Sequence, residues 1–109
     1  MSEPSSDAGA DAVIVFASFR PLPGKAEELH RLLSWMVDNT RREPGCERYD
    51  LYRQTPPAET FHLFERYRND DALQQHRAED HYIEYRRQVP DLIEGSIDVL
   101  LLQVVDAGG

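Results

Sequence analysis

The chain has few means of covalent cross-linking, because Cys46 is the only cysteine among its 109 residues. One cysteine cannot form an internal disulfide, which is typical of a reducing compartment and predicts a cytoplasmic location. Cys46 also has no base beside it in the sequence, so we expect a small, buried apolar side chain and not a nucleophile. A chain of this length can bury one hydrophobic core without disulfides or structural metal.

Positive charge is scarce as well: 12 basic residues face 20 acidic ones, for a net charge of −8. Nucleic acids and anionic membranes require a basic surface, so the composition argues against both as partners. Long hydrophobic runs are absent too, since stretches such as Val13–Ala17 and Val99–Leu102 are far too short to cross a bilayer. The first ten residues lack a basic region and an apolar stretch, and no signal peptide is predicted.

The chain does contain alternating strand-like and helix-like segments. Residues 1–11, rich in Ser, Asp, Ala and Gly, predict a disordered tail ahead of a single domain over residues 12–106. β-Branched and aromatic runs predict strands, and apolar residues at three- and four-residue spacing predict helices. The predicted strands are 13–20, 46–53, 60–67 and 96–105, and the predicted helices are 25–42, a short one from Asn69 to near His76, and 80–89.

This order of elements predicts the α+β class, as a ferredoxin-like four-stranded antiparallel sheet with helices on one face. In the outer strands, at Val13–Ala17 and Val99–Leu102, both alternating faces are apolar. A sheet with one face in water should alternate apolar with polar residues, so the helix-free face needs a cover. A second copy of the chain is the simplest cover. We therefore predict a homodimer whose two sheets pack face to face, burying ~800 Å² per partner.

The candidate catalytic residues lie between Phe61 and Tyr82, where an aromatic-rich strand leads into the short helices. His76 and His81 flank the helix break, and histidine titrates near neutral pH, although either ring could simply pack or favour a helix dipole. Glu65 lies on an apolar strand face, which is costly for a carboxylate unless it is paired or functional. Tyr67 shares that face as a wall residue.

Alternatives remain for these residues and their neighbours. Glu65 could form a salt bridge with an arginine of the paired strand, Arg48 or Arg53. Arg86 and Arg87 are typical of a solvated helix face, or one of them meets an anionic substrate. The side chains expected to line a substrate pocket are those of Tyr52, Phe61, Leu63 and Tyr82.

A metal site is not predicted. The five-residue spacing of His76 and His81 puts them about 140° apart on a continuous helix, unlike the i, i+4 pair of zinc enzymes. No third ligand is evident near them in the sequence.

Together the elements and several short motifs resemble the antibiotic biosynthesis monooxygenase (ABM) family, in particular its quinol monooxygenase-like members. The resemblance covers the chain from about Val13 to Val105. The matching pieces are Pro23-Gly24-Lys25, Glu43-Pro44-Gly45-Cys46, Tyr49-Asp50-Leu51-Tyr52, the strand from Phe61 to Tyr67, and His76 followed by His81-Tyr82.

The resemblance implies a dimeric α+β barrel and cofactor-independent oxygenation of a quinol, anthrone or similar phenolic or polyketide-like substrate. Members of the family use neither flavin nor metal, because the substrate enolate or phenolate itself passes an electron to dioxygen. The implied partners are therefore a small aromatic substrate and O2. Such chemistry needs a base, a hydrogen-bond donor for the developing oxyanion, and an apolar chamber.

Two departures from the family limit what the resemblance implies. Haem-degrading members carry an asparagine on the first strand and a tryptophan on the third, where this chain has Ala17, Ser18 and Tyr67. Haem degradation is therefore disfavoured, and the same tyrosine replaces the tryptophan of polyketide-tailoring members. The run from Phe61 to Tyr82 also resembles isomerases that process a phosphorylated signalling sugar. An isomerase or lyase, or a non-catalytic binding module, remains an alternative.

Overall fold

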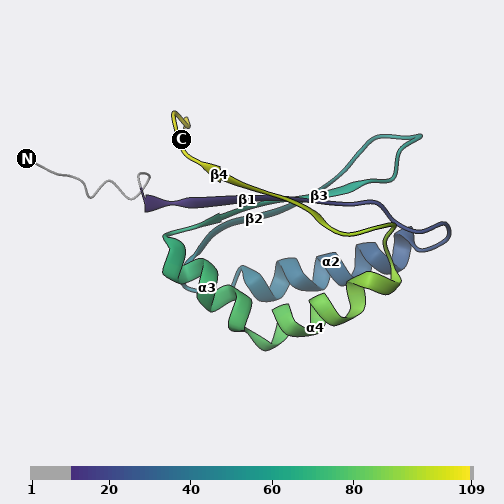
Figure 1. Ribbon diagram of the computed structural model, residues 1–109, viewed down its shortest axis with the longest axis horizontal. Helices are drawn as coiled ribbons and strands as arrows, with labels where there is room; N and C mark the ends of the chain where they lie inside the picture. The colour runs from purple at the N-terminus through teal and green to yellow at the C-terminus, as the bar shows by residue number, and fades with distance from the viewer. Residues whose placement is uncertain (1–10, 109) are drawn as a thin grey trace, which may run out of the picture.

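The computed structural model describes residues 11–108, in which helices cover one side of a four-stranded antiparallel sheet (Figure 1). This confirms the predicted α+β, ferredoxin-like fold. The predicted tail lies outside the described residues, except for Asp11. No helix in the described part is both long and apolar enough to span a membrane. The elements are β1 (Val13–Phe19), α2 (Ala26–Thr40), β2 (Cys46–Arg53), β3 (Phe61–Tyr67), α3 (Asp70–Ala78), α4 (Asp80–Gln88), a 3-10 turn (Val89–Asp91) and β4 (Asp98–Gln103).

The strands are ordered β2-β3-β1-β4, so β1 is an interior strand and only β4 of the two apolar strands lies at an edge. This differs from the expectation of two outer strands. Ala17 of β1 faces Leu63 on one side and Val99 on the other. Because side chains alternate along a strand, this register places Ala17, Leu63 and Glu65 on the face toward the helices.

The core lies between this face and the helix layer. The side chains of α2 that recur at three- and four-residue spacing are fully buried, among them Leu29, Leu33 and Met36. They pack against Phe19 and Phe61 of the sheet in one hydrophobic cluster. The periodicity that predicts the helix therefore also identifies its buried stripe.

A close approach fixes α3 against the end of α2. A Cβ atom at Gly45 would lie 2.4 Å from the Cβ of Ala72, so only glycine fits there. Asn69 caps α3 by accepting a hydrogen bond from the Ala72 backbone N–H at 2.9 Å, as its sequence position predicts. Glu79 then breaks the helical path, because its extended backbone (ψ 147°) ends α3 and begins α4.

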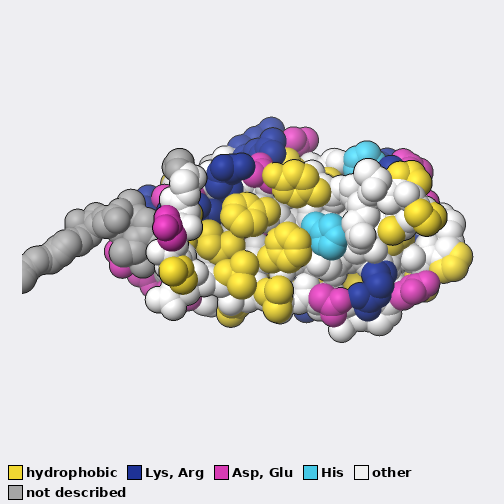
Figure 2. Space-filling model, turned by 90° about the horizontal axis from the view of Figure 1, so that it is seen from above, with side chains coloured by type: hydrophobic (Ala, Val, Ile, Leu, Met, Phe, Trp, Pro, Cys, Tyr) yellow, Lys and Arg dark blue, Asp and Glu magenta, His cyan; other side chains and the backbone are white. Residues whose placement is uncertain are grey.

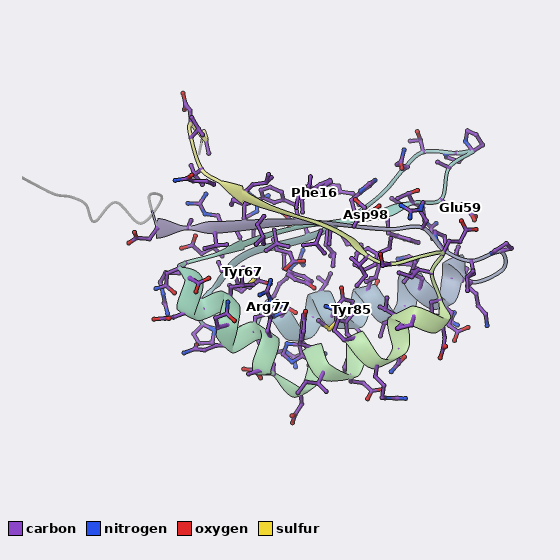
Figure 3. All side chains as sticks on the ribbon, viewed as in Figure 1. Phe16, Glu59, Tyr67, Arg77, Tyr85 and Asp98 are labelled. Atoms are coloured by element: carbon purple, nitrogen blue, oxygen red, sulfur yellow. The ribbon has the colours of Figure 1, made fainter. Side chains whose placement is uncertain are left out.

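The other face of the sheet carries exposed apolar side chains. Phe16 lies on this side, opposite the helices (Figure 3), and Figure 2 shows apolar groups gathered over the middle of the face. Leu100 and Leu102 of β4 belong to the same face and are 58% and 44% exposed. The strands thus have the two apolar faces expected from their sequence.

Candidate active site

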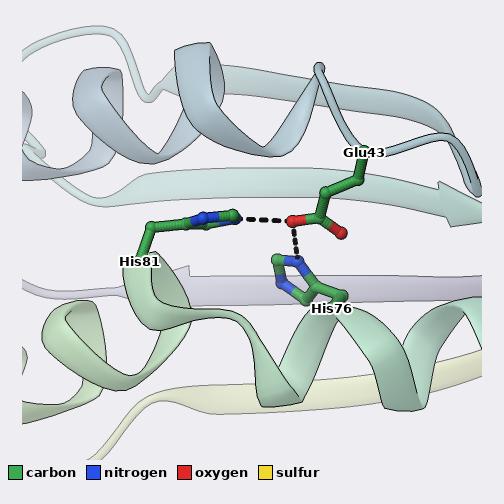
Figure 4. A group of neighbouring side chains, drawn as sticks. All are labelled: Glu43, His76 and His81. Atoms are coloured by element: carbon green, nitrogen blue, oxygen red, sulfur yellow. Dashed lines mark hydrogen bonds and ion pairs between the residues drawn. The ribbon is translucent and has the colours of Figure 1, made fainter.

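Three side chains meet at the end of α3, where one buried carboxylate accepts two imidazole N–H groups (Figure 4). Glu43 Oε2 lies 2.8 Å from His76 Nδ1 and 2.6 Å from His81 Nε2. The side chains are 9%, 2% and 12% exposed, respectively. Distances in this range are those of charge-assisted hydrogen bonds, which are stronger than neutral ones.

The fold explains how residues so distant in sequence meet. Glu43 lies in the turn after α2, His76 in the last turn of α3, and His81 in the first turn of α4. On a continuous helix the two histidines would point apart. The break at Glu79 redirects α4, and the contact of Gly45 with α3 brings the turn of Glu43 beside both rings.

The same three side chains are a donor set that metals use, since one ligand atom from each lies within 4.8 Å of the others. Glu43 Oε2, however, lies at hydrogen-bonding distance from one ring nitrogen of each histidine. A metal would need bonds of about 2.0–2.2 Å to all three and would have to push Glu43 away from the rings. The geometry therefore fits two shared protons better than a bound metal ion.

The hydrogen bonds also assign a tautomer to His76. If Nδ1 donates its hydrogen to Glu43, Nε2 carries the free lone pair. Nε2 makes no hydrogen bond within the described residues, and His76 lines a pocket between the sheet and helices α3 and α4. A carboxylate that holds an imidazole in this way makes the opposite nitrogen a base.

The pocket has a volume of about 70 Å³ and a mixed lining. Val15, Ala17 and Val99 form its apolar floor on the sheet. The polar lining comes from β3, α3 and α4, and consists of Glu65, His76, Arg77, Tyr82, Tyr85 and Arg86. Figure 3 shows Tyr67, Arg77 and Tyr85 in the layer between the sheet and the helices.

Glu65 is a second buried carboxyl with different surroundings. It is 6% exposed and accepts a hydrogen bond of 2.6 Å from the Tyr67 hydroxyl. Burial raises its pKa from 4.5 to about 7, although the Tyr67 hydrogen bond and the charge of Arg77 act in the opposite direction. The pKa of Tyr67 is itself raised by burial and by the nearby carboxyl. Glu65 is thus suited to carry a proton near neutral pH.

The structure places the predicted catalytic residues close together but in different roles. Of these, His76 and Glu65 line the pocket. Tyr67 lies behind them, with its ring centroid 5.1 Å from that of His76 and its hydroxyl bonded to Glu65. His81 reaches the site only through Glu43. The alternative salt bridge of Glu65 is not formed, because Arg48 pairs with Asp50 and Arg53 with Glu27.

The predicted substrate-binding residues are more dispersed. Tyr82 lines the pocket, and its ring lies 5.1 Å from that of His76. Phe61 and Leu63 lie in the hydrophobic core and not in the pocket lining. Tyr52 is 54% exposed near the end of β2 and does not line the pocket.

Glu43 is the residue that sequence reasoning missed. Its motif, Glu43-Pro44-Gly45, predicts the end of a helix and gives no sign that the carboxylate is buried. Cys46 is half-buried and not fully buried as predicted, but burial raises the pKa of its thiol to about 12, which disfavours the nucleophilic thiolate. Arg87 pairs with Glu84, as expected on a solvated helix face, whereas Arg86 lines the pocket.

Known proteins of similar sequence share the fold described above. The sequence model of one family, described as antibiotic biosynthesis monooxygenase, matches residues 12–88. The chain is 43% identical over 94 residues to Rv0793 of Mycobacterium tuberculosis, whose name proposes a monooxygenase; the match covers 86% of this chain and 92% of the relative. The solved structure of Rv0793 has a TM-score of 0.86 at 39% identity and covers 91% of this chain and 100% of that one. The crystal structure of PA3566 from Pseudomonas aeruginosa has a TM-score of 0.82 at 28% identity, covering 90% and 98%.

Proposed function

Because the chain belongs to the antibiotic biosynthesis monooxygenase family, we propose that it oxidises a quinol or related phenol with dioxygen and needs no cofactor. The observation that carries this proposal is the pairing of two groups across one pocket. His76, held by Glu43, presents a base, and Glu65 presents a carboxyl group with a pKa of about 7. General acid–base catalysis works best with groups that titrate near the working pH.

The overall reaction is quinol plus O2 giving a hydroxylated quinone plus water. One oxygen atom forms a new bond to a ring carbon, and the other leaves as water with two hydrogens from the substrate. The substrate supplies all four electrons that reduce dioxygen, so no external reductant is needed.

The residues of the pocket supply the proton transfers of this reaction. His76 Nε2 takes the hydroxyl proton of the substrate, and the Glu43 carboxylate stabilises the imidazolium that results. The phenolate then passes an electron to O2, and the two radicals combine at a ring carbon. When the O–O bond of the resulting peroxide breaks, the ring carbon that carries it loses its hydrogen as a proton, and the C–H electron pair forms the new C=O bond. The departing oxygen takes up this proton and one from the Glu65 carboxyl and leaves as water, and Glu65 is reprotonated by the proton that His76 took from the substrate.

We also propose that the active form is a homodimer formed through the helix-free face of the sheet. The exposed Leu100 and Leu102, together with Phe16, form an apolar surface on this face (Figure 2). Apolar patches of this kind on soluble proteins mark interaction sites. A second copy packed on this face would remove these apolar side chains from water.

Oxygen uptake tests the proposed function directly. Protein freed of metal and flavin should consume one O2 per hydroquinone and form the hydroxylated quinone at a rate proportional to enzyme concentration. If no aromatic quinol stimulates oxygen uptake above the uncatalysed rate, the proposal is wrong.

A second candidate, an isomerase or lyase, is favoured by one observation: His76 and Glu65 alone make an acid–base pair that can move protons without O2. Anaerobic incubation separates the two. Substrate conversion that continues at the same rate without oxygen supports the isomerase, and its loss supports the monooxygenase.

A further inference from the structure

Two arginines stand at the rim of the pocket without a carboxylate partner. Arg77 of α3 and Arg86 of α4 both contribute to the pocket lining, and neither forms an ion pair within residues 11–108. Their neighbour Arg87, by contrast, is paired with Glu84 on the same helix. Two guanidinium groups without a salt bridge to any described residue therefore face one small pocket from two different helices, and of the two it is Arg77 whose charge also acts on Glu65.

The position of Arg86 is fixed by a neighbour in the same pocket. Its Nη1 donates a 2.9 Å hydrogen bond to the Tyr82 hydroxyl, and the guanidinium lies 5.8 Å from the centre of the Tyr82 ring. This arrangement occupies one of five N–H donors of the guanidinium. The others remain available to a ligand, and the planar group suits a carboxylate or phosphate.

The other charged groups of the pocket do not cancel these two arginines. The only carboxyl in the lining is Glu65, whose pKa burial raises to about 7, so it is partly protonated at neutral pH. Glu43 lies behind His76 and is already bonded to two imidazoles. An incoming anion therefore meets a surplus of positive charge.

The size of the pocket limits what can enter it. A cavity of about 150 Å³ holds one benzene molecule, whereas this pocket measures about 70 Å³. It can enclose the reacting edge of one ring but not a fused polycyclic compound. The rest of the molecule must lie at the rim, where the arginines are.

We propose that Arg77 and Arg86 bind an anionic substituent of the substrate, so that the substrate is a single-ring hydroxylated aromatic compound bearing a carboxylate or phosphate. The identity of the ring rests on the proposed function, whereas the binding of the anion does not. The two can therefore be tested separately, by affinity and by turnover.

The test compares two probes of nearly equal shape and different charge, 2,5-dihydroxybenzoate and 2,5-dihydroxybenzamide. Calorimetry on the full chain gives the Kd of each probe under anaerobic conditions, and oxygen uptake gives turnover. We expect the acid to bind about a hundredfold more tightly than the amide, as two charge-assisted contacts of about tenfold each would produce. Benzoate and phenyl phosphate as competitors distinguish a carboxylate site from a phosphate site.

Four variants, one of them a control, locate the effect. Arg77→Gln and Arg86→Gln should each weaken binding of the acid about tenfold and leave the amide unchanged, whereas Arg86→Lys should restore part of the difference. Arg87→Gln, the matched control on the same helix, should change neither. Equal affinity of wild-type protein for acid and amide would overturn the proposal, even if both are oxidised. If the acid binds more tightly than the amide but neither stimulates oxygen uptake, the anion site is upheld and the proposed function is refuted.

Discussion

Two buried carboxyl groups of the site have different properties because their neighbours differ. Glu43 accepts two short hydrogen bonds from imidazoles, which hold its carboxylate beside both rings. Glu65 has one hydroxyl donor, Tyr67, and burial outweighs this hydrogen bond and the charge of Arg77, so its pKa rises to about 7. One carboxyl can thus orient a base while the other holds a proton.

Glu65 should make the stability of the protein depend on pH. Its pKa is 4.5 in an exposed chain and about 7 when folded. Between pH 4.5 and pH 7 the folded state therefore binds more protons than the unfolded state. The free energy of unfolding should therefore fall as pH rises from about 4.5 to 7, by roughly 3 kcal/mol at ~1.4 kcal/mol per pKa unit.

Glu65→Gln should remove this dependence, because the amide is neutral at every pH and still accepts the Tyr67 hydrogen bond. Urea unfolding at pH 5 and pH 8 measures the difference. Glu59→Gln, in the exposed hairpin loop, serves as the control and should behave like wild type. A variant that loses stability from pH 5 to 8 as wild type does would contradict the assigned pKa.

Glu43→Gln should impair catalysis more than binding. The amide carries no charge to stabilise the His76 imidazolium, so we expect kcat to fall roughly 10²-fold with little change in KM. Steady-state oxygen uptake measures both constants. Glu47→Gln, which removes an exposed partner of Arg66, is the matched control and should retain full activity. Equal losses in the two variants would remove Glu43 from the mechanism.

At the scale of elements, the local sequence predicts most of the fold. The spacing of Leu29, Leu33 and Met36 predicts α2 and its buried face, and Asn69 is the N-cap that its position predicts. These features depend on residues near each other in the chain. The interior position of β1 could not be predicted, because apolar residues on both faces fit a central strand as well as an outer one.

The functional site could be predicted only in part, because local sequence patterns do not show which distant residues meet. Glu65, His76 and His81 draw attention by their chemistry within one short stretch of sequence. Glu43 lies 33 residues before His76, and their meeting depends on the fit of Gly45 against α3. That contact is a property of tertiary packing, which no local pattern contains.

Gly45→Ala should therefore separate α3 from the turn that carries Glu43. The new methyl group would lie 2.4 Å from the Ala72 Cβ, and overpacking of this kind costs about 1–3 kcal/mol. Thermal and urea unfolding measure the loss.

The double variant Gly45→Ala/Ala72→Gly tests the cause. Removing the Ala72 methyl group relieves the clash, so the double variant should be more stable than Gly45→Ala. The relief must exceed the ~1 kcal/mol that glycine costs inside a helix. If the double variant is less stable than either single one, the close contact is not what requires glycine.

At the scale of the whole molecule, the apolar helix-free face predicts self-association. Leu100→Glu would place a charge on that face and should convert the proposed dimer to a monomer at micromolar concentration. Ile83→Glu is a matched control, because Ile83 on α4 is also 58% exposed but lies in the helix layer. Sedimentation velocity measures both. A wild-type monomer, or equal dissociation of the two variants, would refute dimerisation through the sheet.

The proposed mechanism depends most on His76 acting as the base in the pocket. The measurement that tests this most directly is oxygen uptake with a hydroquinone by metal- and flavin-free wild type, His76→Gln and the control His30→Gln. His30 lies on α2 and lines no part of the pocket around Glu65. We expect His30→Gln to match wild type and His76→Gln to lose at least 10²-fold in kcat while remaining folded. Undiminished turnover in a folded His76→Gln variant would show that His76 is not the base.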